Sequence, residues 1–147
     1  MVTLAYGDDT AGEGTNYGAA YIIFGGSSIA TGDKDTMNSS NWDLKLYGNW
    51  GDRLYRAACG DLNNDGIDDI AVTSLYDDYN GRGSSGAVYV VFGRSDIGTG
   101  TKSINSVDNI RYEGASSSDY LGYSVVFGDV NGDSVDDLAI GQMHQDY

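Results

Sequence analysis

Two short acidic segments carry the residues best suited to chemistry. In each, oxygen-bearing side chains occupy loop positions 1, 3, 5 and 9, and position 7 offers a backbone carbonyl. Calcium takes about six to eight oxygen ligands, which alternate residues of a tightly curled loop can direct inward. The segments 61–69 and 129–137 therefore predict two Ca²⁺ sites, whose ligands would be Asp61, Asn63, Asp65, Ile67 and Asp69 in the first and Asp129, Asn131, Asp133, Val135 and Asp137 in the second.

The spacing differs from that of an EF-hand, which needs a bidentate Glu at position 12, where this chain has Val72 and Ile140. Instead, the acid at position 9 leads directly into an apolar run, so each segment is predicted to be the turn of a β-hairpin. Turns without an ion are the alternative, since Asn, Asp and Gly tolerate turn conformations. Mutual repulsion of the four acids in each loop favours a bound cation.

Two loop positions qualify this prediction. Ser134 stands where the first loop has Gly66, a position that often needs a left-handed backbone, so the second site is expected to be strained or weaker. Asp68 and Asp136, at position 8, are expected to point away from the ion.

Both loops belong to an internal repeat of 68 residues. Residues 60–72 recur as 128–140, and residues 18–25 recur as 86–93. Each period holds four short apolar or alternating runs bounded by turn residues, which is the number of strands in one propeller blade. The absence of Pro and the abundance of Gly and Tyr also favour short strands. The predicted fold class is all-β, with β-propeller blades of four antiparallel strands.

The repeat divides the chain into three units. Residues 1–52 are predicted to be a partial blade containing strands 2 to 4, at 2–6, 19–24 and 43–46. Residues 53–120 would form a complete blade, with strands at 54–59, 69–73, 87–92 and 109–112, and residues 121–147 a partial blade with strands 1 and 2, at 123–127 and 137–141. Open strand edges at both ends make further blades of a parent propeller the expected partners, with self-assembly as an alternative.

Composition excludes several functions. The chain has 22 acidic and 8 basic residues, so it would repel a phosphate backbone and no nucleic-acid partner is expected. No apolar run approaches the roughly 18 residues that span a membrane. No Ser or Cys has a recognisable nucleophile context, and His144 is the only histidine, so no enzyme is expected. The pair Asp77-Asp78 is interpreted as part of a solvated loop.

The loops and the strands around them resemble the FG-GAP repeat of integrin alpha-chain propellers. In that family the repeat runs from a Phe-Gly to a Gly-Ala-Pro. The last repeat here has Leu121-Gly122 and Gly141-Gln142-Met143 at those places, and the middle repeat has Arg53-Leu54 and Thr73-Ser74-Leu75. The calcium loop therefore carries the resemblance.

The resemblance implies calcium binding, an extracellular or cell-surface location, and a role in adhesion or assembly with an unknown protein or glycan ligand. The alternatives are an accessory propeller of a secreted hydrolase and a glycan-binding propeller.

Overall fold

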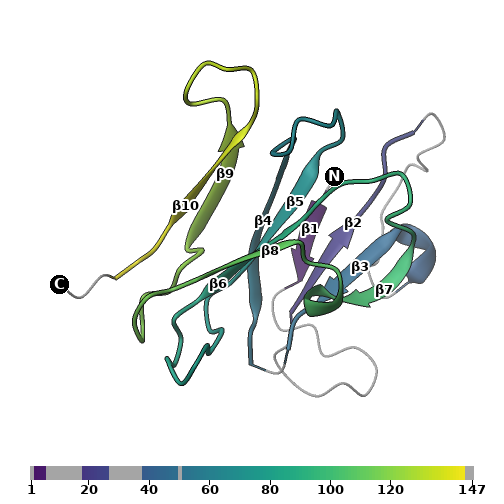
Figure 1. Ribbon diagram of the computed structural model, residues 1–147. Coiled ribbons are helices and arrows are strands. Elements are labelled where there is room, and N and C mark those ends of the chain that lie inside the picture. The colour runs from purple at the N-terminus through teal and green to yellow at the C-terminus, as the bar shows by residue number, and fades with distance from the viewer. Residues whose placement is uncertain (1, 6–17, 27–37, 50, 145–147) are drawn as a thin grey trace.

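A computed structural model describes residues 2–5, 18–26, 38–49 and 51–144, and its regular structure there is almost entirely β (Figure 1). The strands of the described residues form three sheets, which Figure 1 shows in a row: β1-β2-β3-β7, then β4-β5-β6-β8, then β9-β10. Their bounds are β1 Val2–Ala5, β2 Ala19–Ile22, β3 Leu44–Tyr47, β4 Leu54–Gly60, β5 Asp69–Ser74, β6 Ala87–Val91, β7 Gly100–Ser103, β8 Ile110–Glu113, β9 Ser124–Gly128 and β10 Asp137–Gly141.

The middle sheet is the complete four-stranded sheet that the repeat predicts. Its order is β4-β5-β6-β8, and every neighbouring pair is antiparallel. The observed strands begin and end within one residue of the predicted ones. All residues of β5 and β6 are buried. Their continuous Val, Ile and Ala runs are typical of strands covered on both faces, and the fold class predicted from the sequence is confirmed.

The first sheet departs from the prediction at its outer edge. Strands β1, β2 and β3 are antiparallel, as expected, but β7 lies parallel to β3 in the order β1-β2-β3-β7. The β7 segment comes from the connection between β6 and β8, so one sheet takes up a strand from the next. The backbone N–H of Gly100 donates to the carbonyl of Asp43 at 2.8 Å. Buried Ile97 and Ile104 anchor the two sides of β7.

The third sheet contains β9 and β10, which lie where strands were predicted at 123–127 and 137–141. Of the predicted strand 2–6, Tyr6 lies outside the described residues. The connections include two single-turn 3₁₀ helices, η1 Ser39–Asn41 and η2 Ile104–Ser106.

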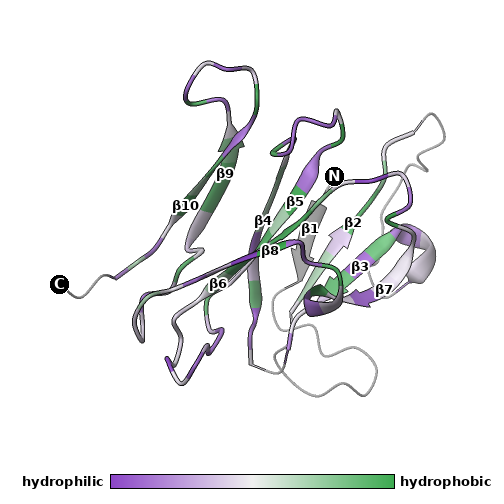
Figure 2. Ribbon diagram, viewed as in Figure 1, coloured by the Kyte–Doolittle hydropathy of each residue, from purple (hydrophilic) through white to green (hydrophobic). Residues whose placement is uncertain are grey.

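The core lies between successive sheets, and Figure 2 shows hydrophobic residues mostly on the strands, while β7 and the loops between β4 and β5 and between β9 and β10 are mainly hydrophilic. One cluster joins the first and middle sheets through buried side chains that include Leu44, Leu46, Val72 and Tyr89. A second cluster packs the middle sheet against β9 and β10, and its members are Ala71, Val88, Val90, Leu62, Phe92, Ile110, Leu121, Val125, Phe127, Leu138 and Ile140. Face-to-face packing of small sheets is the arrangement of propeller blades.

Helices long and apolar enough to cross a membrane are absent from the described residues.

Candidate metal centre

The first acidic loop joins β4 to β5 and is curled by its own side chains. Asp61 accepts backbone hydrogen bonds from Asp65 at 3.0 Å and from Gly66 at 2.8 Å, one on each carboxylate oxygen. Asn63 Oδ1 also accepts from the Asp65 N–H at 3.0 Å, and Asp65 Oδ1 accepts from the Ile67 N–H at 2.9 Å. Positions 1, 3 and 5 therefore turn their oxygens toward the inside of the loop.

The second loop, between β9 and β10, repeats this arrangement at the corresponding residues. Asp129 accepts from the N–H groups of Asp133 at 3.1 Å and Ser134 at 2.8 Å. Asn131 Oδ1 accepts from the Asp133 N–H at 2.9 Å, and Asp133 Oδ1 from the Val135 N–H at 2.9 Å. The N–H donors from Ser134 and Gly132 hold the pKa of Asp129 below its usual value. Both loops lie at the same end of neighbouring sheets (Figure 1).

The expected left-handed backbone is present at position 6 of both loops. Gly66 has φ of +83° and Ser134 has φ of +70°. Glycine adopts this conformation freely, whereas the Cβ of serine meets the following carbonyl oxygen there. The predicted strain at Ser134 is therefore present in the backbone, while weaker ion binding at this loop stays a prediction.

Position 9 has different surroundings in the two loops. Asp69 is fully buried, and its carboxylate accepts from the N–H groups of Leu62 at 3.0 Å and Gly93 at 2.8 Å. Burial raises the pKa of Asp69, which these two donors partly offset. Asp137 accepts from the Val130 N–H at 3.0 Å. The Asp69 carboxylate thus binds its own loop through Leu62 and the segment after β6 through Gly93, two residues beyond the end of that strand.

The donor chemistry of both loops suits a hard cation. Each offers three carboxylates, an amide oxygen and a backbone carbonyl, with no nitrogen or sulfur ligand, which is the set that Ca²⁺ prefers. Within the described ranges, no three His, Cys, Asp or Glu side chains converge as a metal site by themselves. A site in these loops would therefore depend on the amide and carbonyl oxygens as well.

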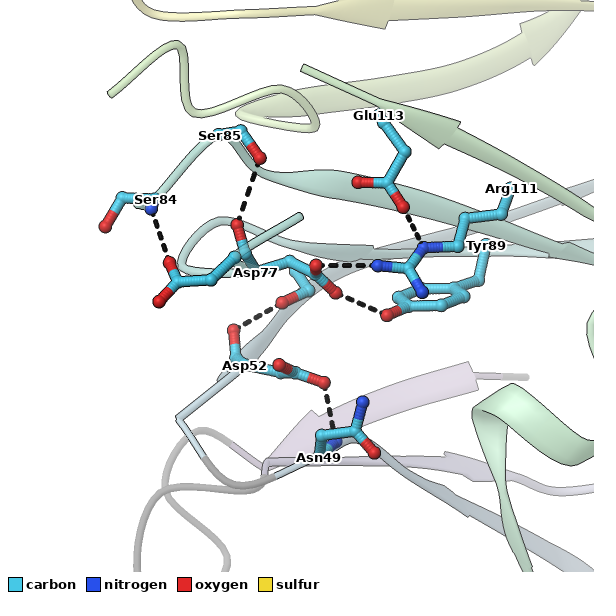
Figure 3. Close-up of polar contacts among 10 residues, drawn as sticks. Asn49, Asp52, Asp77, Ser84, Ser85, Tyr89, Arg111 and Glu113 are labelled. Atoms are coloured by element: carbon cyan, nitrogen blue, oxygen red, sulfur yellow. Dashed lines mark hydrogen bonds and ion pairs between the residues drawn. The ribbon is translucent and has the colours of Figure 1, made fainter. Parts of the chain in front are cut away.

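A second polar cluster, which the sequence analysis missed, lies at the other end of the middle sheet (Figure 3). Asp77 is 2% exposed and accepts from the Tyr89 hydroxyl at 2.5 Å and from Arg111 Nη2 at 2.7 Å. Arg111 also pairs with Glu113 and lies over the rings of Tyr79 and Tyr89. The interpretation of Asp77 as solvated is wrong, because Arg111 and Tyr89 compensate its burial.

Asp52 belongs to the same region and precedes β4. Burial raises its pKa to about 6, with the charge of Asp77 adding to the effect of burial. The Asn49 N–H donates to Asp52 Oδ2 at 2.6 Å, and the Ser74 hydroxyl donates to the Asp52 carbonyl. These contacts join the segment between the first two sheets to the end of β5, which makes the cluster a structural junction.

The fold and the loops define a class: an all-β repeat protein built from propeller-type sheets with acidic hairpin turns. Residues 55–91 and 121–145 match the model of the FG-GAP repeat, and each range contains one of the loops. Those two ranges therefore match the FG-GAP repeat, the resemblance that the sequence analysis predicted.

One curated relative is Integrin alpha pat-2 of Caenorhabditis briggsae, to which the chain is 35% identical over 96 residues. The match covers 65% of this chain, and the chain spans about 7% of the length of that relative. The predicted integrin-like character is thus confirmed at the level of the repeat.

Proposed function

We propose that this chain is a calcium-stabilised, non-catalytic β-propeller module that serves adhesion, surface display or assembly outside the cell. One observation carries the proposal: two loops, 68 residues apart, use the same side chains to receive the same backbone N–H groups. A turn that binds no ion does not require the same acid, with the same hydrogen-bond partners, at positions 1, 5 and 9 of two separate loops. The FG-GAP match to both loops and the integrin relative support the adhesive, extracellular setting.

The residues proposed to hold Ca²⁺ are those at positions 1, 3, 5, 7 and 9 of each loop. Bound Ca²⁺ would supply two positive charges to a loop that carries four acids. The chain's own part is to keep the loop curled before binding, through the N–H groups that Asp61 and Asp129 receive. A loop curled in this way would fix the hairpin between the first two strands of a blade, and with it the shape of one propeller face.

The proposed partners are further blades of a parent propeller and an unidentified protein or glycan ligand. The outward face of β9 supports the first of these, because Val126 is 58% exposed on a strand whose opposite face packs in the core. The proposed blade boundaries are those of the repeat, near residues 52 and 120.

The test is thermal unfolding of the chain in EDTA, in millimolar CaCl₂ and in MgCl₂. A ligand that binds only the folded state stabilises it by about 1.4 kcal/mol per site when its concentration is about ten times Kd. We expect a rise in Tm specific to Ca²⁺, which Asp65→Ala or Asp133→Ala halves and the double variant abolishes. Asp96→Ala is the matched control, since it removes one acid whose side chain is 83% exposed far from both loops in sequence. An unchanged Tm in a folded chain would refute the calcium proposal.

A further inference from the structure

The two candidate calcium loops touch each other through a residue that neither would use as a ligand. Asp136, at position 8 of the second loop, accepts a hydrogen bond from the backbone N–H of Asp61 at 3.1 Å. In return, the backbone N–H of Asp136 donates to the carbonyl of Asp61 at 3.3 Å. Position 1 of the first loop is thus held on both sides of its backbone by the second loop.

This contact depends on a glycine at the end of β4. A Cβ added to Gly60 would lie 2.6 Å from Asp136 Oδ2 and 2.5 Å from the Cβ of Phe127. The same addition to Gly128, its counterpart one repeat later, would meet nothing within 4 Å. The absence of a side chain at residue 60 is therefore what lets the loops approach.

Among the described residues, the counterpart of Asp136 in the first loop, Asp68, makes no hydrogen bond to another acidic loop. Asp68 is exposed and lines a cavity of 710 Å³ between the first two sheets. Asp68 and Asp136 share their loop position and their neighbouring Asp, so they form a pair matched in sequence, of which only Asp136 makes the contact with Asp61.

We infer that Asp136 couples the two loops, so that Ca²⁺ binding in one raises the Ca²⁺ affinity of the other. The inference rests on the proposed calcium function. Asp136 lies between Val135 and Asp137, two proposed ligands of the second loop, so ordering that loop places the Asp136 carboxylate. The carboxylate then holds Asp61, whose side chain receives the N–H groups that curl the first loop.

The sign of the coupling follows from order and not from charge. Two divalent ions in neighbouring loops repel each other, and the Asp136 carboxylate attracts each ion whether or not the other is bound, so positive coupling must come from the shared ordering of Asp61 and Asp136. Linkage makes the effect reciprocal: whatever factor the second loop gives to the first, the first gives back. Coupling of this kind commonly changes affinity by at least about fivefold, and we expect a factor of about five here.

The experiment is calcium calorimetry on a set of variants of the full chain. Asp133→Ala reports the affinity of the first loop alone, and Asp65→Ala that of the second loop alone. The coupling factor is the product of the two affinities in the unmodified chain divided by the product of these single-loop affinities. We expect a factor near five, falling to about one in the Asp136→Ala background. Asp136→Asn, which keeps an acceptor oxygen, should recover part of it, and Asp68→Ala should leave it unchanged.

Amide hydrogen exchange of residues 61–66 in EDTA gives a readout without calcium. Asp136→Ala should accelerate exchange at Asp61 and Gly66, and Asp68→Ala should not. Two loops that bind Ca²⁺ with a coupling factor of one refute the coupling alone and leave the proposed function standing. A folded chain in which neither loop takes up Ca²⁺ refutes both.

Discussion

The close approach at Gly60 gives the sharpest prediction about stability. Its φ lies outside the left-handed range, so alanine can adopt the backbone conformation, and only space opposes the substitution. A Cβ there would stand 2.5 Å from the Cβ of Phe127, on a strand that packs in the core. Overpacking of this kind costs about 1 to 3 kcal/mol. At Gly128 the space is open, and the lower entropy of the unfolded chain should make alanine neutral or stabilising by about 0.4 to 1 kcal/mol.

The assay is urea denaturation in EDTA, so that calcium contributes nothing to either free energy. Gly60→Ala should unfold at lower urea and Gly128→Ala at equal or higher urea, with free energies of unfolding separated by about 1 to 4 kcal/mol. The slopes should agree, because the surface exposed on unfolding is the same. Equal midpoints for the two variants would refute the packing of β4 against β9, and with it the contact between the loops.

Three further predictions concern single side chains. The pKa of Asp52 is about 6 in the folded chain against 3.8 for the free group, so the unfolded chain ionises first as pH rises. The free energy of unfolding therefore falls between about pH 4 and pH 6. In urea denaturation, Asp52→Asn should have the same free energy of unfolding as the unmodified chain at pH 4 and a value up to about 3 kcal/mol higher at pH 7. Equal free energies of unfolding at both pH values would contradict this. Tyr89→Phe removes the donor to buried Asp77 and should cost about 1.5 to 3 kcal/mol in the same assay, where a loss below about 0.5 kcal/mol would count against it. Ser134→Gly should relieve about 1 kcal/mol of left-handed strain in the folded chain and raise its free energy of unfolding in EDTA by up to that amount, and an unchanged urea midpoint would show that position 6 of this loop is not strained.

The strands of the middle sheet could be predicted because their signals are local. The apolar runs in β5 and β6 and the turn residues between them mark both ends of each strand within a few residues. The 68-residue period then placed the second loop by analogy with the first.

The β7 strand gave no such signal. Its sequence, Gly-Thr-Lys-Ser, has no apolar alternation, and its residues are half-buried or exposed. It is a strand because the edge of β3 offers partners for its backbone groups, which no pattern in residues 100–103 records.

The polar junction was missed for a related reason. Asp52, Asp77 and Arg111 come from three separate segments, and only the folded chain brings them together (Figure 3). A pair such as Asp77-Asp78 in a Gly-rich segment is usually solvated. Asp77 can be buried because Arg111, 34 residues further on, donates a hydrogen bond to its carboxylate. The contact of Asp136 with Asp61 spans 75 residues and is equally invisible to local reasoning.

Because β7 pairs with β3, the segment that repeats in the sequence and the sheet that forms in the fold do not have the same boundaries in this chain. A gene duplication copying residues 53–120 would copy a strand that finds its hydrogen-bond partners only on the sheet before it. Any new neighbour must therefore present a free outer edge, and a block moved to an unrelated protein would carry an unsatisfied strand with it. Repeats that overlap in this way can be lengthened in series but are poorly suited to being shuffled singly.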